Sequence, residues 1–247
     1  MHSPVEQFTI KVLYSLTFLG YDISFTNSSL FMVLAVLVSS GFLYFAMRPA
    51  STIPGKVQCL AEMMYEFVAN ILDSNVGKEG KPYFPFIFTL FLFILFSNLL
   101  GLIPYSYTVT SQIVVTFAMA FTIFIGVTLI GLFKHGLHFF SFFVPEGAPK
   151  VLLPLIILIE VISYLIRPVS LSVRLFANML AGHTMLKVFA GLAVMMTGAG
   201  GFLLVSSPLP LLVIVALTGL ELLVAMLQAY VFTILTCMYL NDALHLH

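Results

Sequence analysis

The chain has 247 residues, of which 61% are hydrophobic and only 8% are charged, and its mean hydropathy is +1.12. Soluble globular domains carry about 25% charged residues, so this composition indicates a membrane protein. The formal net charge is zero and no basic tract occurs, so electrostatics give no argument for nucleic-acid binding. Cys59 and Cys237 are too few and too far apart for a disulfide framework or a zinc site. We expect no metal and no cofactor.

Three apolar runs in the first part of the chain are long enough to cross a hydrocarbon core of about 30 Å, which takes roughly 20 helical residues. These predicted spans are residues 29–47, 84–104 and 111–134, the last two forming a hairpin. Residues 54–76 instead interleave charged and apolar residues at helical spacing, which is typical of an amphipathic helix on the membrane surface.

Two further segments are too long for a simple crossing. Residues 149–191 and 208–241 would extend roughly 64 Å and 50 Å as helices at 1.5 Å per residue. They must therefore tilt steeply or bend, and Pro154 and Pro168 are candidate bend points. The uncharged, glycine-rich MMTGAGG between them is predicted to be a turn.

Together these segments predict an all-α polytopic membrane protein with about five membrane-crossing helices and one surface amphipathic helix. Residues 1–247 are expected to form a single membrane domain that ends in a long, steeply tilted two-helix hairpin. No internal repeat of the kind found in many secondary transporters is evident.

The orientation is predicted from lysine and arginine in the links, because these residues are more frequent on the cytoplasmic or matrix side. The links on one side contain Arg48, Lys56, Lys78, Lys81, Lys134 and Lys150. The links on the other side contain Lys11 alone. We therefore place the N-terminus outside and the C-terminus inside.

The two long segments contain few polar side chains that could act chemically. They are Glu160, Ser163, Arg167, Arg174, Asn178, His183 and Lys187 in the first, and Glu221, Gln228 and Asp242 in the second. An ionised side chain at mid-membrane costs about 2.5 to 3.5 kcal/mol on insertion scales, so each is a candidate functional residue.

Arg174 is the residue whose presence most needs a reason. Seven-residue spacing returns to nearly the same helical face, so Glu160, Arg167 and Arg174 form one stripe. A buried salt bridge within this chain is one interpretation, but Glu160 lies about 21 Å from Arg174 along an ideal helix. Glu221 or Asp242 could reach Arg174 only if the register of the hairpin allowed it. The alternative is a carboxylate partner on another chain. Arginine suits this role because it stays charged when desolvated and binds carboxylates bidentately.

The other polar residues have both structural and functional interpretations. His183 could be a satisfied core histidine, but an imidazole and the Glu221 carboxyl can also exchange protons near neutral pH. Glu160 and Asp242 could reach interfacial water from helix ends. Gln228 could hydrogen-bond across the hairpin, and Arg167 could snorkel or pair with Glu160.

Several phrases of the sequence resemble one known family. SLSVRLFANMLAGH at residues 170–183 and LELLVAMLQAYVFTILTCMYL at residues 220–240 look like subunit a of the F-type ATP synthase. SPVEQF near the start, FSNLLGLIPYSYTVTSQ at residues 96–112 and YLNDALHLH at the end extend the resemblance over essentially the whole chain. The terminal phrases resemble mitochondrial and alphaproteobacterial members in particular.

The resemblance implies that Arg174 is the essential arginine that faces the rotating ring of c subunits and their lipid-embedded carboxylate. Asn178 and Gln228 would support it, with Ser163 as a further polar residue. The arginine would also separate two aqueous half-channels.

By the same resemblance, His183 and Glu221 would line the half-channel open to the outside. Glu160 and Asp242 would line the half-channel open to the matrix or cytoplasm. The coupling ion is expected to be a proton, because no cluster of oxygen ligands for a metal cation is evident in the sequence.

The implied function is that of a non-catalytic stator subunit that couples proton flow to rotation and ATP synthesis, with no ATP site of its own. The implied partners are the c-subunit ring, a peripheral-stalk b-type subunit, other ATP synthase subunits, lipids and protons. The location would be the mitochondrial inner membrane or an alphaproteobacterial plasma membrane. The alternatives are a self-contained proton-coupled secondary transporter and a structural membrane scaffold.

Overall fold

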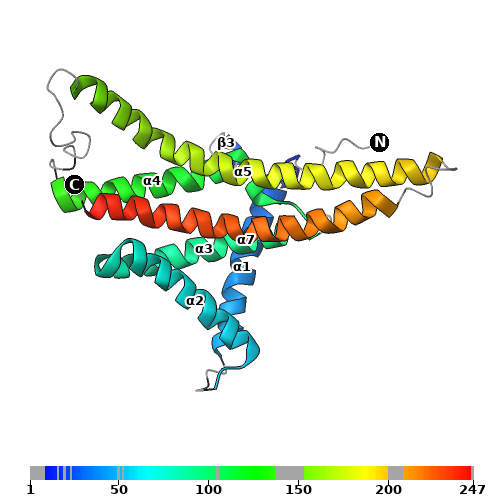
Figure 1. The fold of residues 1–247 in the computed structure, drawn as a ribbon, viewed down its shortest axis with the longest axis horizontal. Coiled ribbons are helices and arrows are strands. Elements are labelled where there is room, and N and C mark those ends of the chain that lie inside the picture. The colour runs from blue at the N-terminus through cyan, green and yellow to red at the C-terminus, as the bar shows by residue number, and fades with distance from the viewer. Residues whose placement is uncertain are drawn as a thin grey trace. The chain divides into compact units, whose positions relative to one another are not determined.

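A computed structural model describes residues 9–15, 17–18, 21–22, 24–48, 51, 53–103, 106–136, 139, 153–199 and 208–245 (Figure 1). Helices dominate these residues, which confirms the predicted fold class. The α-helices are α1 Asn27–Met47, α2 Lys56–Asn75, α3 Phe84–Gly101, α4 Ile113–His135, α5 Leu153–Ala199 and α7 Pro208–Leu244. Short 3₁₀ helices, η2 Gly77–Tyr83 and η3 Val109–Ser111, precede α3 and α4.

Five helical segments among the described residues are long and apolar enough to cross a membrane. They are Asn27–Met47, Gly77–Gly101, Ile113–His135, Leu153–Gly198 and Pro208–Leu244. Helices suit this environment because they satisfy their backbone hydrogen bonds internally, which hydrocarbon requires. The chain is therefore a multi-pass membrane protein.

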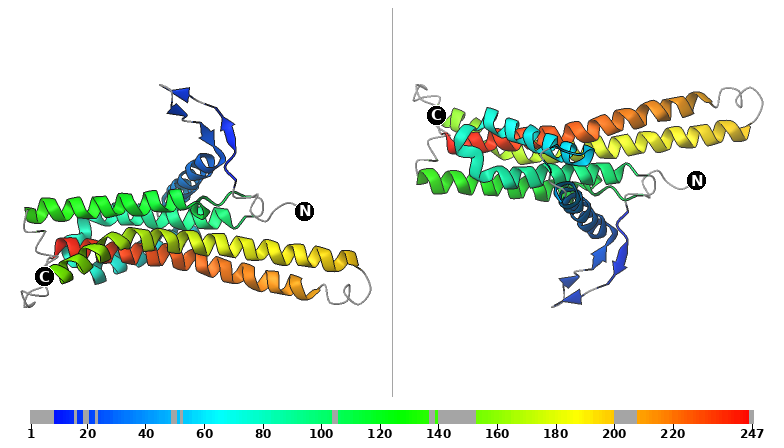
Figure 2. Two further views of the ribbon diagram at one scale, coloured as in Figure 1. Left: turned by 90° about the horizontal axis from the view of Figure 1, so that it is seen from above. Right: turned by 90° about the horizontal axis from the view of Figure 1, so that it is seen from below.

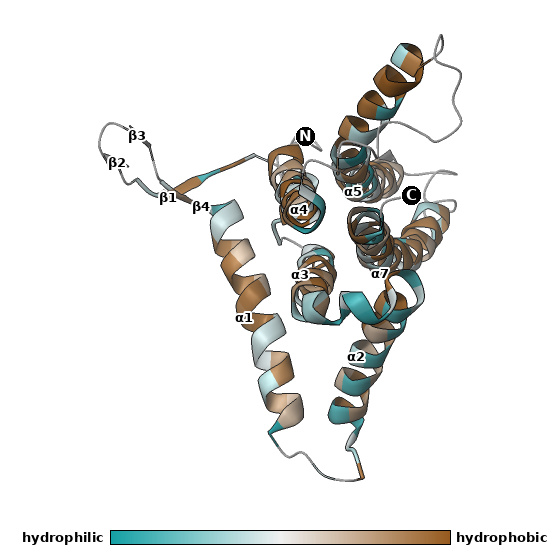
Figure 3. Ribbon diagram, turned by 90° about the vertical axis from the view of Figure 1, so that its left-hand side faces the viewer, coloured by the Kyte–Doolittle hydropathy of each residue, from teal (hydrophilic) through white to brown (hydrophobic). Residues whose placement is uncertain are grey.

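Helix α2 is the amphipathic element between the first two spans. Ala61, Val68, Ile71 and Leu72 are buried on one of its faces, while charged residues alternate with them along the helix. Figure 3 shows hydrophilic residues along the whole of α2. The helix ends where Gly77 takes a φ of 73°, a left-handed conformation that favours glycine, and Val76 N–H donates to Leu72 O.

The first long helix ends later than the sequence pattern indicates. Helix α5 continues past Gly191 to Ala199, so the MMTGA part of the predicted turn is helical. An interior glycine costs about 1 kcal/mol relative to alanine, but an open backbone turn costs more in an apolar environment. Pro168 lies inside α5, whereas Pro154 lies in its first turn, where no hydrogen bond is lost. Residues 149–152 of the predicted segment lie outside the described residues.

Short strands, which were not predicted from the sequence, precede α1. β1 Val12–Tyr14 pairs antiparallel with β4 Phe25–Thr26, and β2 Thr17–Phe18 with β3 Tyr21–Asp22 (Figure 2). Their β-branched and aromatic residues favour strands. Thr26 then begins α1, because its N–H donates to Ser29 Oγ at 2.9 Å while Ser29 N–H donates to Thr26 Oγ1 at 3.4 Å.

The chain divides into two compact units, each assembled from three separate stretches of sequence. Unit 1 comprises residues 1–41, 93–112 and 175–229, and unit 2 comprises residues 42–92, 113–174 and 230–247. The single membrane domain proposed from the sequence stays a prediction.

In unit 2 the end of α7 is held against α4. Lys134 Nζ bonds to Glu79 Oε2 and donates to Leu244 O at 3.2 Å, and His135 Nε2 lies 3.1 Å from the same carbonyl. Basic side chains at a helix C-terminus satisfy its free carbonyls and interact favourably with the helix dipole. Gly131 of α4 allows close packing, since a Cβ there would lie 2.7 Å from the Phe139 ring and 3.3 Å from Ala243 Cβ.

We predict that Gly131→Ala lowers the thermal unfolding midpoint of the detergent-solubilised protein, because overpacking costs about 1 to 3 kcal/mol. Gly126→Ala on the same helix is the matched control, since a Cβ there meets nothing within 4 Å. Equal midpoints for both variants, measured by scanning fluorimetry, would contradict the close packing at Gly131.

Candidate functional site

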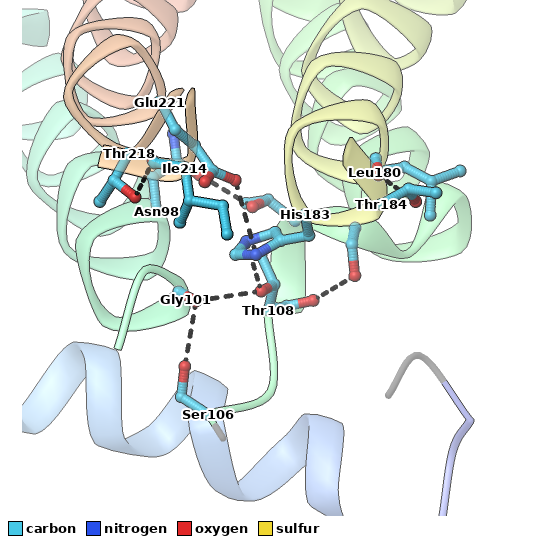
Figure 4. Close-up of polar contacts among 12 residues, drawn as sticks. Asn98, Gly101, Ser106, Thr108, Leu180, His183, Thr184, Ile214, Thr218 and Glu221 are labelled. Atoms are coloured by element: carbon cyan, nitrogen blue, oxygen red, sulfur yellow. Dashed lines mark hydrogen bonds and ion pairs between the residues drawn. The ribbon is translucent and has the colours of Figure 1, made fainter. Parts of the chain in front are cut away.

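The centre of the site in unit 1 is a buried pair of ionisable side chains on the two long helices. His183 of α5 places Nδ1 3.5 Å from Oε1 of Glu221 on α7, and the two side chains are only 9% and 5% exposed (Figure 4). The structure thus brings together two residues that the sequence analysis predicted to act as a pair. Such a pair can pass a proton between imidazole and carboxyl.

The other ring nitrogen of His183 contacts Thr108, which is fully buried in the link between α3 and α4. Thr108 Oγ1 lies 3.0 Å from His183 Nε2 and also donates to Gly101 O at 3.4 Å. When the Thr108 proton goes to Gly101 O, His183 Nε2–H must donate to Thr108 Oγ1. In that arrangement Nδ1 faces the Glu221 carboxyl without a hydrogen on it and can exchange a proton with it.

Glu221 is buried with neither carboxyl oxygen hydrogen-bonded to any group in the described part of the chain. Its carboxyl packs against Gly182, where an added Cβ would lie 2.7 Å from Oε1 and 3.1 Å from Cδ. A buried polar group without hydrogen bonds is costly, and native proteins normally satisfy such groups with water or a proton-bearing partner. The Glu221 carboxyl is therefore suited to hold a mobile proton.

A second buried network supports α7 one turn beyond Glu221. Asn98 Nδ2 of α3 donates to Ala225 O at 3.2 Å, and Thr110 Oγ1 donates to Asn98 Oδ1 at 2.8 Å. Both bonds lie in unit 1 and fix α3 and the following link against α7. Asn98, Thr108, Thr110 and Gly182 were not predicted from the sequence to have a role. For the first three, the signal available in the sequence was a polar side chain within or just after an apolar span.

In unit 2 the polar residues of the two long helices form a different arrangement. Arg167 Nη1 of α5 donates to Asp242 Oδ2 of α7 at 2.7 Å, so Arg167 pairs with Asp242 rather than with Glu160. The reason is distance, because residues seven apart lie about 10.5 Å from each other along a helix. Glu160 is half-buried and Ser163 is exposed, and Glu160 forms no ion pair among the described residues.

Arg174 is exposed at the end of the α5 segment that belongs to unit 2. Within the described ranges no carboxylate forms an ion pair with it. Asn178 is half-buried and Gln228 is buried, and both belong to unit 1. Their predicted support of Arg174 therefore stays a prediction. Over the described residues, no group of three or more His, Cys, Asp or Glu side chains is placed to hold a metal ion.

These features define a class: a multi-pass membrane protein with a buried histidine–glutamate pair and an arginine that, among the described residues, has no carboxylate beside it. The ATP synthase A chain family model matches residues 29–241. Proteins called ATP synthase subunit a are similar over nearly their whole length. The one from Rhodospirillum rubrum is 56% identical over 247 residues, 100% of both chains.

Two other relatives with that description agree. The protein of Rhizobium rhizogenes is 55% identical over 244 residues, 99% of this chain and 98% of its own. That of Chelativorans is 57% identical over 242 residues, 98% and 97% of the two chains. The chain belongs to the ATP synthase A chain family, which confirms the resemblance found in its sequence.

We predict that Thr108→Val reduces proton translocation by the intact complex about tenfold, because His183 Nε2 loses its partner and the tautomer is no longer fixed. Thr108→Ser, which keeps the hydroxyl, is the matched control and should retain most of the rate. The rates are measured as acidification of proteoliposomes. Equal loss in both variants would contradict the role of the hydrogen bond, because Thr108→Ser keeps the hydroxyl group.

We also predict that Gly182→Ala impairs translocation, because the new Cβ would displace the Glu221 carboxyl from its position beside His183. Gly191→Ala on the same helix is the control, since a Cβ there meets nothing within 4 Å. The same acidification assay applies. Full activity of Gly182→Ala would argue against a fixed position of the Glu221 carboxyl.

Proposed function

We propose that this chain is the stator subunit a of an F-type ATP synthase and couples proton flow to rotation and ATP synthesis. Family membership supports the role in proton translocation. The single observation that carries the mechanism is that Arg174 is exposed on a predominantly apolar helix and has no ion-pair partner in the described part of the chain. Its partner in this proposal is a carboxylate of the c-subunit ring.

The outer half-channel would use the site built in unit 1. A proton reaching Glu221 is shared with His183, whose other nitrogen is occupied by Thr108, and is passed on to a ring carboxylate. The carboxylate becomes neutral on protonation and can then rotate through lipid, since the cost of an ionised group in hydrocarbon disappears.

The inner half-channel would be lined by Glu160 and Asp242. After nearly a full turn, the ring carboxylate releases its proton there and becomes ionised again. Arg174 then stabilises the carboxylate by a charge-assisted hydrogen bond, with Asn178, Gln228 and Ser163 as supporting polar residues. Its fixed positive charge also repels protons, so the two half-channels stay separated.

The driving force comes from the membrane potential. Each proton moving across 100 mV releases about 2.3 kcal/mol, so several protons are needed for one ATP. A long, oblique hairpin would serve this purpose by contacting several ring subunits at once. Helices α5 and α7, with 47 and 37 residues, have the length that such a contact requires.

The partners and the orientation follow from the same proposal. The chain would associate with the c-ring, a peripheral-stalk b-type subunit and other ATP synthase subunits. The N-terminus would lie outside and the C-terminus inside, as the lysine and arginine distribution predicts. The relatives reported above are alphaproteobacterial, which favours a bacterial plasma membrane over the mitochondrial inner membrane.

The proposal predicts that Arg174→Ala abolishes ATP-driven acidification in proteoliposomes containing the whole complex, while the complex still assembles. Passive proton leak, measured separately, should rise because the barrier between the half-channels is lost. Met185→Leu, at an exposed position of the same helix, serves as a control and should pump normally. Unchanged pumping by Arg174→Ala would contradict the mechanism and favour a structural scaffold.

The subunit composition of the purified protein, rather than its rate of proton transport, distinguishes a stator subunit from a self-contained secondary transporter. Purification in mild detergent should recover the chain together with a ring of small hydrophobic subunits. Recovery of the chain alone, still able to move protons, would contradict the stator role.

A further inference from the structure

The ion pair between Arg167 and Asp242 joins α5 to α7 within unit 2. The two side chains meet at 2.7 Å and are only 21% and 34% exposed. Arginine binds carboxylates strongly in such settings, because its guanidinium group remains charged and is weakly hydrated. Asp242 therefore has its counter-charge within this chain, unlike Arg174.

Two tyrosine rings hold the guanidinium group of this pair in place. Arg167 Cζ lies 5.3 Å from the Tyr164 ring centroid and 5.2 Å from that of Tyr239. Both separations are within the range of cation–π attraction, which strengthens as water is excluded. The Tyr164 hydroxyl is itself fixed, since it lies 2.7 Å from Thr128 Oγ1 of α4. The side chains of three helices thus hold Arg167 beside Asp242.

Glu160 and Asp242, the two acids assigned to the inner half-channel, consequently differ in the free-energy cost of protonation. Protonating Asp242 would remove the counter-charge of Arg167 and leave a partly buried cation unpaired, which is costly. Glu160 is half-buried and has no ion pair among the described residues, so its protonation leaves no unpaired charge behind. The environment of Glu160 therefore suits a group that takes up and releases a proton in every cycle better than that of Asp242.

We infer that Arg167 is a positioning residue of the inner half-channel, which keeps Asp242 as a permanently ionised, fixed pair and leaves proton exchange on that side to Glu160. The inference rests on the proposed function. Asp242 then shapes the channel wall and neutralises Arg167, and it carries no protons itself. Arg167 in turn contributes no net positive charge that would compete with Arg174.

The test is a double-mutant cycle in the intact complex, read out as ATP-driven acidification per assembled complex. Arg167→Gln should lower pumping about tenfold, because it leaves the Asp242 charge unpaired. The double variant Arg167→Gln/Asp242→Asn should recover to within about threefold of the parent, because it leaves no unpaired charge. Glu160→Gln should lower pumping, and adding it to the double variant should abolish the recovery.

A proton-carrying role of Asp242 cannot produce this recovery, because the double variant has no carboxyl group at position 242. If the double variant pumps no better than Arg167→Gln, or Arg167→Gln pumps like the parent, the inference is overturned. Should Arg167→Gln fail to assemble, Arg167→Lys, which keeps the charge, and the double variant carry the test. Both should pump within about threefold of the parent, and a larger loss in either would overturn the inference. Failure of the proposed function is distinguishable, because it appears as normal pumping by Arg174→Ala whatever the outcome of this cycle.

Discussion

The cost of placing ionisable groups in hydrocarbon governs the chemistry of this chain, and the structure meets it in three ways. Arg167 is neutralised by Asp242 within unit 2. Glu221 is placed beside His183 in unit 1, where the pair can share a proton. Arg174 has an exposed position and no carboxylate partner among the described residues. A charge that is neither paired nor replaced by a neutral form requires a partner from elsewhere, and this requirement is the physical basis of the proposed function.

The two long helices supply the positions for all three arrangements. Residues seven apart return to one face, so α5 carries Arg167 and Arg174 on the same side, while α7 contributes Glu221 and Asp242. The shorter helices and their links then orient these groups. Thr108 contacts His183 in unit 1, and Thr128 positions Tyr164 beside Arg167 in unit 2.

The helices themselves could be predicted from the sequence, because apolar runs of about 20 residues have few alternatives to a membrane-spanning helix. The pairing of His183 with Glu221 was also anticipated, since both are rare residue types in such runs. The contact between Thr108 and His183 was not, because it joins residues 75 positions apart and helical periodicity does not define how one element faces another. The extension of α5 through Gly191 was missed because glycine signals a turn in water more reliably than within an apolar helix.

In the proposed function, the counter-charge of Arg174 belongs to another chain. The most direct measurement is a high-resolution structure of the intact complex in lipid, in which the distance from the Arg174 guanidinium to the nearest carboxylate is determined. We predict a carboxylate of the c-subunit ring at about 3 Å, or joined through a single water. An ion pair between Arg174 and Glu160, Glu221 or Asp242 of its own chain would contradict it.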